Sequence, residues 1–126
     1  MAKDAIATKD APAAIGPYSQ AIRAGDLIFM SGQIGLDPTT GMLVESLEGQ
    51  THQVLLNIRA VASAAGASLD DIVKLTLFVT DMNDFARVNE IMQSYFKPPY
   101  PARSTVEVAG LPRGARIEVE GILASR

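Results

Sequence analysis

Cysteine is absent from this chain of 126 residues, and histidine occurs once, as His52. Without a thiol the protein has no disulfide bond, no thiolate nucleophile and no thiolate metal ligand. A zinc site needs several nitrogen or sulfur ligands, so a single histidine argues against zinc and we expect no metal ion. His52 stands close to the polar residues Gln50 and Gln53. That setting predicts a surface side chain and not a member of a Ser-His-Asp triad.

Phosphate-binding glycine loops and runs of basic residues are missing too. The segment Gly32-Gln33-Ile34-Gly35 lacks the following helix and the Lys-Ser/Thr end that nucleotide-binding loops need. The chain has 11 basic and 14 acidic residues, a formal net charge of −3. This balance argues against a protein whose affinity for nucleic acid comes from neutralising phosphates.

Long hydrophobic runs are absent as well. The longest uncharged apolar stretch, 27–36, is too short to span a membrane. Residues 1–6 lack the basic start and apolar core of a secretory signal. With 48% hydrophobic and 20% charged residues, the composition is that of a globular protein. We therefore expect one soluble domain, 1–126, in the cytoplasm.

Hydrophobic periodicity predicts a two-layer α+β fold. Apolar residues at spacings of three and four predict a helix over 47–65 and a second helix that Asp81 caps and Pro98-Pro99 ends. Alternation and turn residues predict strands at 18–24, 27–31, 72–80, 101–108 and 116–120, an arm or edge segment at 1–15, and a loop or short hairpin at 33–44. These elements predict a mixed β-sheet with two helices on one face.

The last two strands alternate strictly between polar and apolar residues. We expect them to form a hairpin, one register of which sets Arg103 opposite Glu120, Thr105 opposite Glu118 and Glu107 opposite Arg116. Together with Thr76 and Phe78, these polar residues would then share the sheet face away from the helices. That face is either a solvated surface, a contact in a symmetric oligomer, or a pocket for a small carboxylic acid, which the planar fork of an arginine can bind.

Several ordered segments of this chain resemble the RidA (YjgF-like) family of enamine/imine deaminases. They are Gly16-Pro17-Tyr18-Ser19-Gln20-Ala21, Met30-Ser31-Gly32-Gln33-Ile34, Asp84-Phe85-Ala86-Arg87-Val88-Asn89, Pro101-Ala102-Arg103-Ser104, Val106-Glu107-Val108 and Ile117-Glu118-Val119-Glu120. The resemblance implies a chorismate-mutase-like fold assembled as a homotrimer, with its sheets inward and an active site at each subunit interface. It also implies hydrolysis of 2-imino acids of the 2-aminoacrylate and 2-iminobutanoate type to 2-oxo acids and ammonia. It implies neither a cofactor nor an association with a membrane.

The resemblance also implies roles for individual residues. Arg103 corresponds to the arginine that binds the substrate carboxylate, and Glu118 to the glutamate that activates water. Tyr18 is a third catalytic candidate, supplied across the interface, and the other substrate-binding candidates are Thr105, Ser31, Gly32 and Asn89. Thr105 stands where many relatives carry cysteine, so a thiol has no part in this protein. A backbone N–H could take the place of that thiol in the site.

Two other functions remain open at this point. One is a regulatory trimer that binds 2-oxo acids without turnover. The other is an endoribonuclease, an activity also attributed to relatives, although the single histidine and the net negative charge argue against it.

Overall fold

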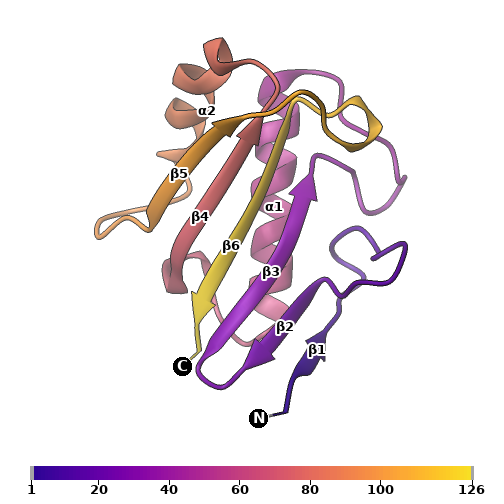
Figure 1. Ribbon diagram of the computed structural model, residues 1–126, viewed down its shortest axis with the longest axis vertical. Helices are drawn as coiled ribbons and strands as arrows, with labels where there is room; N and C mark the ends of the chain where they lie inside the picture. Colours follow the sequence, from indigo (N-terminus) through magenta and orange to yellow (C-terminus); the bar gives the residue numbers. More distant parts are fainter. Residues whose placement is uncertain (1, 126) are drawn as a thin grey trace.

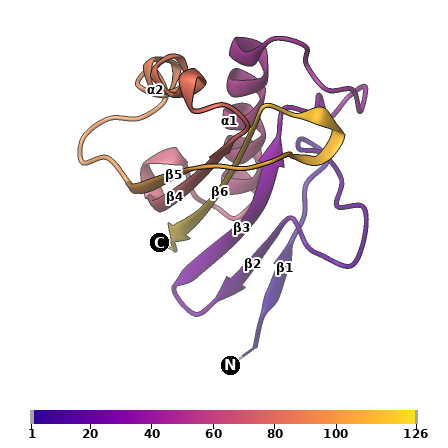
Figure 2. The same ribbon diagram turned by 45° about the horizontal axis from the view of Figure 1, so that its top comes forward.

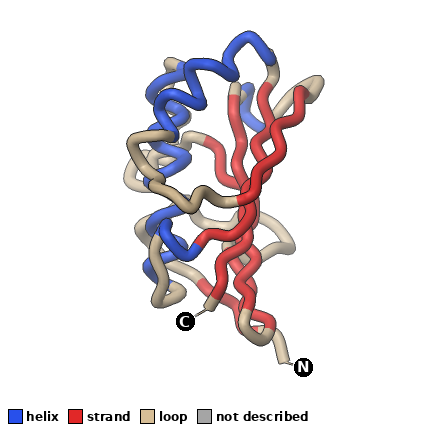
Figure 3. Tube along the Cα trace, turned by 90° about the vertical axis from the view of Figure 1, so that its left-hand side faces the viewer, coloured by secondary structure: helices blue, strands red, loops and turns tan. Residues whose placement is uncertain are grey.

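The computed structural model describes residues 2–125, which form a mixed six-stranded sheet with both helices packed on one face (Figure 1 and Figure 3). The strands follow the order β1-β2-β3-β6-β4-β5 across the sheet. Their bounds are β1 Asp4–Ile6, β2 Ala21–Ala24, β3 Leu27–Ile34, β6 Ile117–Ala124, β4 Ile72–Val79 and β5 Ala102–Glu107. Neighbouring strands are antiparallel except β4 and β5, which are parallel. The predicted two-layer α+β fold is confirmed.

The core lies between the sheet and helix α1 (Leu47–Ala64). Alternate residues of β4 and β6, such as Leu75 and Ile117, are buried on the helix side, where α1 presents Leu55 and Ile58. Burying one such side chain contributes about 1.5–3 kcal/mol. The alternation that predicted the strands is therefore the pattern that fills this core.

The helix boundaries follow local capping. The Ser46 side chain accepts a hydrogen bond of 2.9 Å from the Gly49 N–H, which confirms the start expected for α1. Asp81 accepts from the Asn83 N–H, but it caps the short 3₁₀ turn Met82–Asp84 that leads into α2 (Phe85–Met92). Helix α2 ends at Met92, earlier than the end that the sequence predicted at Pro98-Pro99. Within the described chain, neither helix combines the length and apolarity that crossing a bilayer requires.

The expected hairpin between β5 and β6 is wrong, because β4 lies between these two strands. Arg103 pairs with Leu75 and Thr105 with Leu77, whereas Glu118 pairs with Phe78. The connection from β5 to β6 contains the 3₁₀ turn Pro112–Gly114 instead of a tight hairpin turn. Figure 2 shows this connection reaching over to the β3 side of the sheet before it turns back into β6.

The three ion or hydrogen-bond pairings expected across that hairpin are absent as well. Glu120 lies opposite Thr76, and Glu107 accepts a hydrogen bond of 2.7 Å from the Met82 N–H. Arg116 instead forms an ion pair with Asp84, at 3.0 Å from its Nη2 to Oδ1. Both contacts fasten the 3₁₀ turn before α2 to the sheet, and they fix the position of that helix.

The correction also changes which side chains share a face. Paired residues in neighbouring strands point to the same side of a sheet. Arg103 and Thr105 therefore lie on the helix side with Leu75 and Leu77, whereas Glu118 and Glu120 remain on the open face. The expectation that all four polar residues share the open face is wrong.

Candidate active site

Arg103 lies on the edge strand β5, beside helix α2. Its Nη1 donates a hydrogen bond of 2.7 Å to the Oδ1 of Asn89, and its guanidinium carbon lies 5.3 Å from the ring centroid of Phe85. The amide fixes the direction of the guanidinium and the aromatic face supports the cation from one side. Because Asn89 is uncharged, this contact orients Arg103 without neutralising it.

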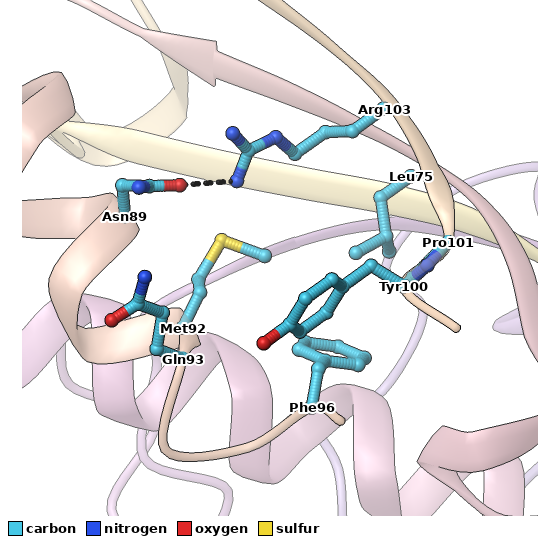
Figure 4. A pocket seen from close by; sticks show the side chains of 8 residues that line it. All are labelled: Leu75, Asn89, Met92, Gln93, Phe96, Tyr100, Pro101 and Arg103. Atoms are coloured by element: carbon cyan, nitrogen blue, oxygen red, sulfur yellow. Dashed lines mark hydrogen bonds between the residues drawn. The ribbon is translucent and has the colours of Figure 1, made fainter. Parts of the chain in front are cut away.

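A cavity of about 410 Å³ opens beside Arg103, between β4, β5 and α2 (Figure 4). Its walls are Leu75, Asn89, Met92, Gln93, Phe96, Tyr100, Pro101 and Arg103. Among these residues the sequence singles out Arg103 and Asn89 as site candidates, whereas Met92 and Phe96 belong to the apolar stripe of the second predicted helix. The spacing of Asn89, Met92, Gln93 and Phe96 at three and four residues is the signal that could have revealed a shared face.

Glu118 lies on β6 and is half-buried on the open face. Burial raises the pKa of its carboxyl above the ordinary value of 4.5, and the nearby Glu120 carboxylate raises it further. A carboxylate with a raised pKa binds a proton more readily, which suits a group that accepts a proton from water.

Gly32 makes room for this carboxylate. A Cβ atom at this position would lie 2.0 Å from the Glu118 Oε2. The pairing of β3 with β6 shifts register between Met30 and Gln33, so Ser31 and Gly32 form a β-bulge. Bulges recur next to active sites because they redirect side chains locally.

The bulge is tied to the segment that carries Tyr18. Ser31 donates from its hydroxyl to the Ser19 carbonyl at 2.6 Å, and from its backbone N–H to the Gln20 carbonyl at 3.0 Å. Gln20 is buried and donates to the Pro12 carbonyl at 2.7 Å, which holds the N-terminal arm in place. A second cavity, of about 670 Å³, follows; its lining includes Tyr18, Ser31, Gly32, Pro112, Arg113, Glu118 and Glu120.

The predicted site residues therefore fall into two groups. The first, which we call the Arg103 half, contains Arg103 and Asn89, with Thr105 on the same face of β5. The second, the Glu118 half, contains Tyr18, Ser31, Gly32 and Glu118. Within the chain the sheet separates the two halves. His52, in contrast, is an exposed helix residue whose Nδ1 lies 2.7 Å from the Tyr95 hydroxyl, as the sequence predicts for a surface side chain.

Comparison with known proteins places this geometry in context. A RutC family protein of Pyrococcus horikoshii is 51% identical over 121 residues, covering 95% of this chain and 96% of that protein. A Salmonella typhimurium protein named 2-iminobutanoate/2-iminopropanoate deaminase is 48% identical over 124 residues and covers 96% of this chain and 97% of its own. The crystal structure of E. coli TdcF with bound serine is 42% identical, with a TM-score of 0.93 over 98% of this chain and 99% of that one.

The family model described as endoribonuclease L-PSP matches residues 8–125, which is nearly the whole chain. Together with the relatives and the shared fold, this match shows that the chain belongs to the YjgF/RidA family.

Proposed function

We propose that this protein is a deaminase that hydrolyses reactive 2-imino acids to 2-oxo acids and ammonia. The observation that carries the proposal is an arginine held by a neutral amide on one half of the site and a carboxylate of raised pKa on the other. The Salmonella relative is named for this activity, at 48% identity.

Arg103 binds the substrate carboxylate in this proposal. Its guanidinium offers a planar fork of donors that matches a carboxylate with two parallel hydrogen bonds. Asn89 holds the guanidinium from one side and leaves its charge for the substrate. Thr105 follows on the same face of β5, and we place it beside the bound carboxylate.

The complete site joins two protomers. Arg103 and Glu118 point to opposite faces of one sheet, so the Arg103 half of one protomer must meet the Glu118 half of its neighbour. A head-to-tail contact of this kind closes into a ring, and we propose a homotrimer with a site at each interface. The open face supports such a contact, because Phe29 is 45% exposed and Val106 is 42% exposed on it.

The chemistry is an addition followed by an elimination. Water forms a bond to the imine carbon while the electron pair of the C=N double bond moves to nitrogen, and Glu118 takes a proton from the water. Glu118 passes this proton to the nitrogen, which gives a neutral carbinolamine. The carbon–nitrogen single bond then breaks while the carbon–oxygen double bond forms; Glu118 takes the hydroxyl proton and gives it to the leaving nitrogen, so both protons of the water end on ammonia. Fixing the carboxylate with Arg103 lowers the entropy cost of aligning the imine with water. Tyr18 presents its side chain to this site from the same protomer as Glu118.

The test generates the imine in situ with serine or threonine dehydratase and follows 2-oxo acid formation. We expect the wild type to accelerate product formation and Arg103→Ala to lose about ten- to a hundredfold in rate, the cost of one charged hydrogen-bonding partner. Arg59→Ala is the matched control, because Arg59 lies over the Tyr95 ring away from both cavities. Full activity of Arg103→Ala would contradict the role of Arg103.

The regulatory alternative rests on the same arginine. A wild-type protein that fails to accelerate product formation but binds 2-oxo acids saturably, and loses that binding in Arg103→Ala, would support a ligand-binding trimer instead of an enzyme.

A further inference from the structure

We propose that the cavity between β4, β5 and α2 binds the substrate side chain, and that it selects long aliphatic or thioether side chains over a methyl or ethyl group. This inference rests on the proposed function, since it takes Arg103 as the anchor for the carboxylate. It concerns which 2-imino acids the protein prefers.

The position of the cavity supports this assignment. Arg103 and Asn89 stand at one end of it, and Figure 4 shows the side chains of Met92, Tyr100 and Phe96 directed into the space beside that end. A carboxylate bound to the guanidinium therefore places the carbon chain of the same molecule next to these walls. The cavity and the anchor belong to one protomer, so the neighbour is not needed to form it.

The size of the cavity exceeds the need of a small substrate. At about 410 Å³ it falls within the range of roughly 300–1,000 Å³ that is usual for small-molecule sites. A methyl or ethyl side chain would leave most of this space to water. A longer side chain would displace that water from apolar walls and gain binding energy for each methylene it buries.

The chemistry of the walls favours apolar over charged side chains. Leu75 is 1% exposed and Met92 is 5% exposed, so these two residues give the inner wall an apolar surface. Methionine adapts its shape to different occupants and contacts sulfur or aromatic groups favourably. A cationic side chain would lose its hydration against this wall, and the charged residue of the lining, Arg103, has the same sign of charge.

Apart from Arg103 and Asn89, the polar side chains of the lining lie toward the rim. Gln93 is exposed at the end of α2, and Tyr100 is 58% exposed in the loop before β5. In Figure 4 the Tyr100 hydroxyl points toward Gln93 across the opening. These two side chains limit the length of the substrate side chain that the cavity can hold. Because they lie at its rim, substituting them changes the size of the cavity with little effect on the hydrophobic core.

The experiment compares imines of different length. An L-amino acid oxidase supplies the imines of alanine, 2-aminobutanoate, leucine and methionine, and semicarbazide traps whatever the protein has not hydrolysed. We expect kcat/KM for the leucine and methionine imines to exceed that for the alanine imine at least about tenfold, the least that one well-buried methylene contributes.

Filling the cavity tests the location. Gln93→Trp should lower the ratio of kcat/KM for the methionine imine to that for the alanine imine at least about tenfold. Glu90→Trp is the matched control, because Glu90 lies on the same helix, is 69% exposed and is outside the cavity lining. Tyr100→Ala, which removes a wall from an exposed loop, should lower the same ratio and provides a second variant if Gln93→Trp folds poorly.

The outcomes separate this inference from the proposed function. Turnover of the 2-aminobutanoate imine by the wild type supports the proposed function whatever the ratio is. A wild type that hydrolyses this imine but works less well on the leucine and methionine imines would overturn the selection for long side chains. An unchanged ratio in folded Gln93→Trp and Tyr100→Ala would overturn the assignment of the cavity.

Discussion

Arg103 and Glu118 lie on the two strands that flank β4, and their side chains leave the sheet on opposite faces. Arg103 shares a face with the buried Leu75, whereas Glu118 shares the open face with Phe78. The sheet therefore stands between the two groups within one chain. A site that uses both must therefore be built from two copies of the chain.

Mixed oligomers test this arrangement directly. Arg103→Ala and Glu118→Gln should each be nearly inactive alone, yet co-expression of the two chains should restore activity. An interface is intact when a chain with Arg103 meets a neighbour with Glu118. Every trimer that contains both chains has one such interface out of three, so mixed trimers should show about one third of the wild-type activity. The measurement is the specific activity of oligomers purified through two different tags.

The control for this experiment is a mixture of the two variants purified separately and combined without exchange of subunits, which should stay inactive. Co-expressed chains that form stable oligomers but remain inactive would contradict a site shared between protomers.

Gly32→Ala should impair activity more than stability. The added Cβ would lie 2.0 Å from the Glu118 Oε2, so the end of this flexible side chain must move. We expect kcat to fall about tenfold or more, because small displacements of a catalytic group are costly. Gly110→Ala, where no atom lies within 4 Å of the added Cβ, is the neutral control.

Gly35→Ala should impair stability more than activity. Here the added Cβ would lie 2.7 Å from the Cα of Gln50, a backbone atom of α1 that cannot move alone. We expect a loss of about 1–3 kcal/mol in the free energy of unfolding, as for other overpacked positions. Thermal and urea unfolding of both glycine variants, beside their kcat values, would separate the two effects. Equal loss of stability in both would contradict the distinction.

Asn89→Ala should weaken substrate binding through Arg103. The amide accepts a hydrogen bond of 2.7 Å from the guanidinium, and hydrogen bonds to charged groups contribute about 1.5–3 kcal/mol. We expect kcat/KM to fall about tenfold, mostly through KM, while the melting temperature changes little because Asn89 is only half-buried. Asn89→Gln, which can still accept the hydrogen bond, should recover part of the loss.

Glu120→Gln should move the acidic limb of the pH–rate profile to lower pH. Burial is the larger cause of the raised pKa of Glu118, and the Glu120 charge is the smaller one. Removing that charge lowers the pKa of Glu118 without returning it to 4.5, so Glu118 remains a base at lower pH. The profile of kcat/KM measured for both proteins gives the shift. A limb that stays in place would mean that Glu118 is not the base.

Glu118→Gln should stabilise the fold at neutral pH while it removes activity. Because folding raises the pKa of Glu118, its ionised form is disfavoured in the folded state, and stability is lost as pH rises through the raised pKa. The neutral amide avoids that loss. We expect a higher melting temperature than the wild type at pH 8, and a difference that shrinks as the pH falls through the raised pKa and disappears below 4.5.

Local patterns in the sequence predicted most of the elements but not how the last two strands are placed. Alternation fixes which residues of a strand share a face, and capping at Ser46 fixes where α1 begins. Neither feature specifies which strand lies next to which. Strand β6 has buried residues at every second position and pairs along both edges, with β3 and β4, so β5 takes the outer edge.

The wrong placement of the last two strands also made the predicted arrangement of the site wrong. A hairpin would have set Arg103 and Glu118 on one face of one protomer, whereas the structure divides them. Asn89 reads as a surface residue in the helix pattern alone, and only the contact with Arg103 gives it a purpose. The motifs that resemble the family identified these residues, but the pairing of distant strands decides on which face of the sheet each residue lies.

The parallel pairing of β4 with β5 has a consequence for how such proteins diversify. Parallel neighbours need a crossover connection, and here that connection carries α2. Asn89, Arg103 and most of the cavity wall thus come from the single stretch 85–103, whereas Gly32 and Glu118 lie outside it. Under the proposed function, insertions, deletions or recombination confined to this stretch can change the range of substrates and leave Gly32 and Glu118 unchanged. The residues proposed to select the substrate side chain and the carboxylate proposed to activate water thus lie on separate stretches of the chain.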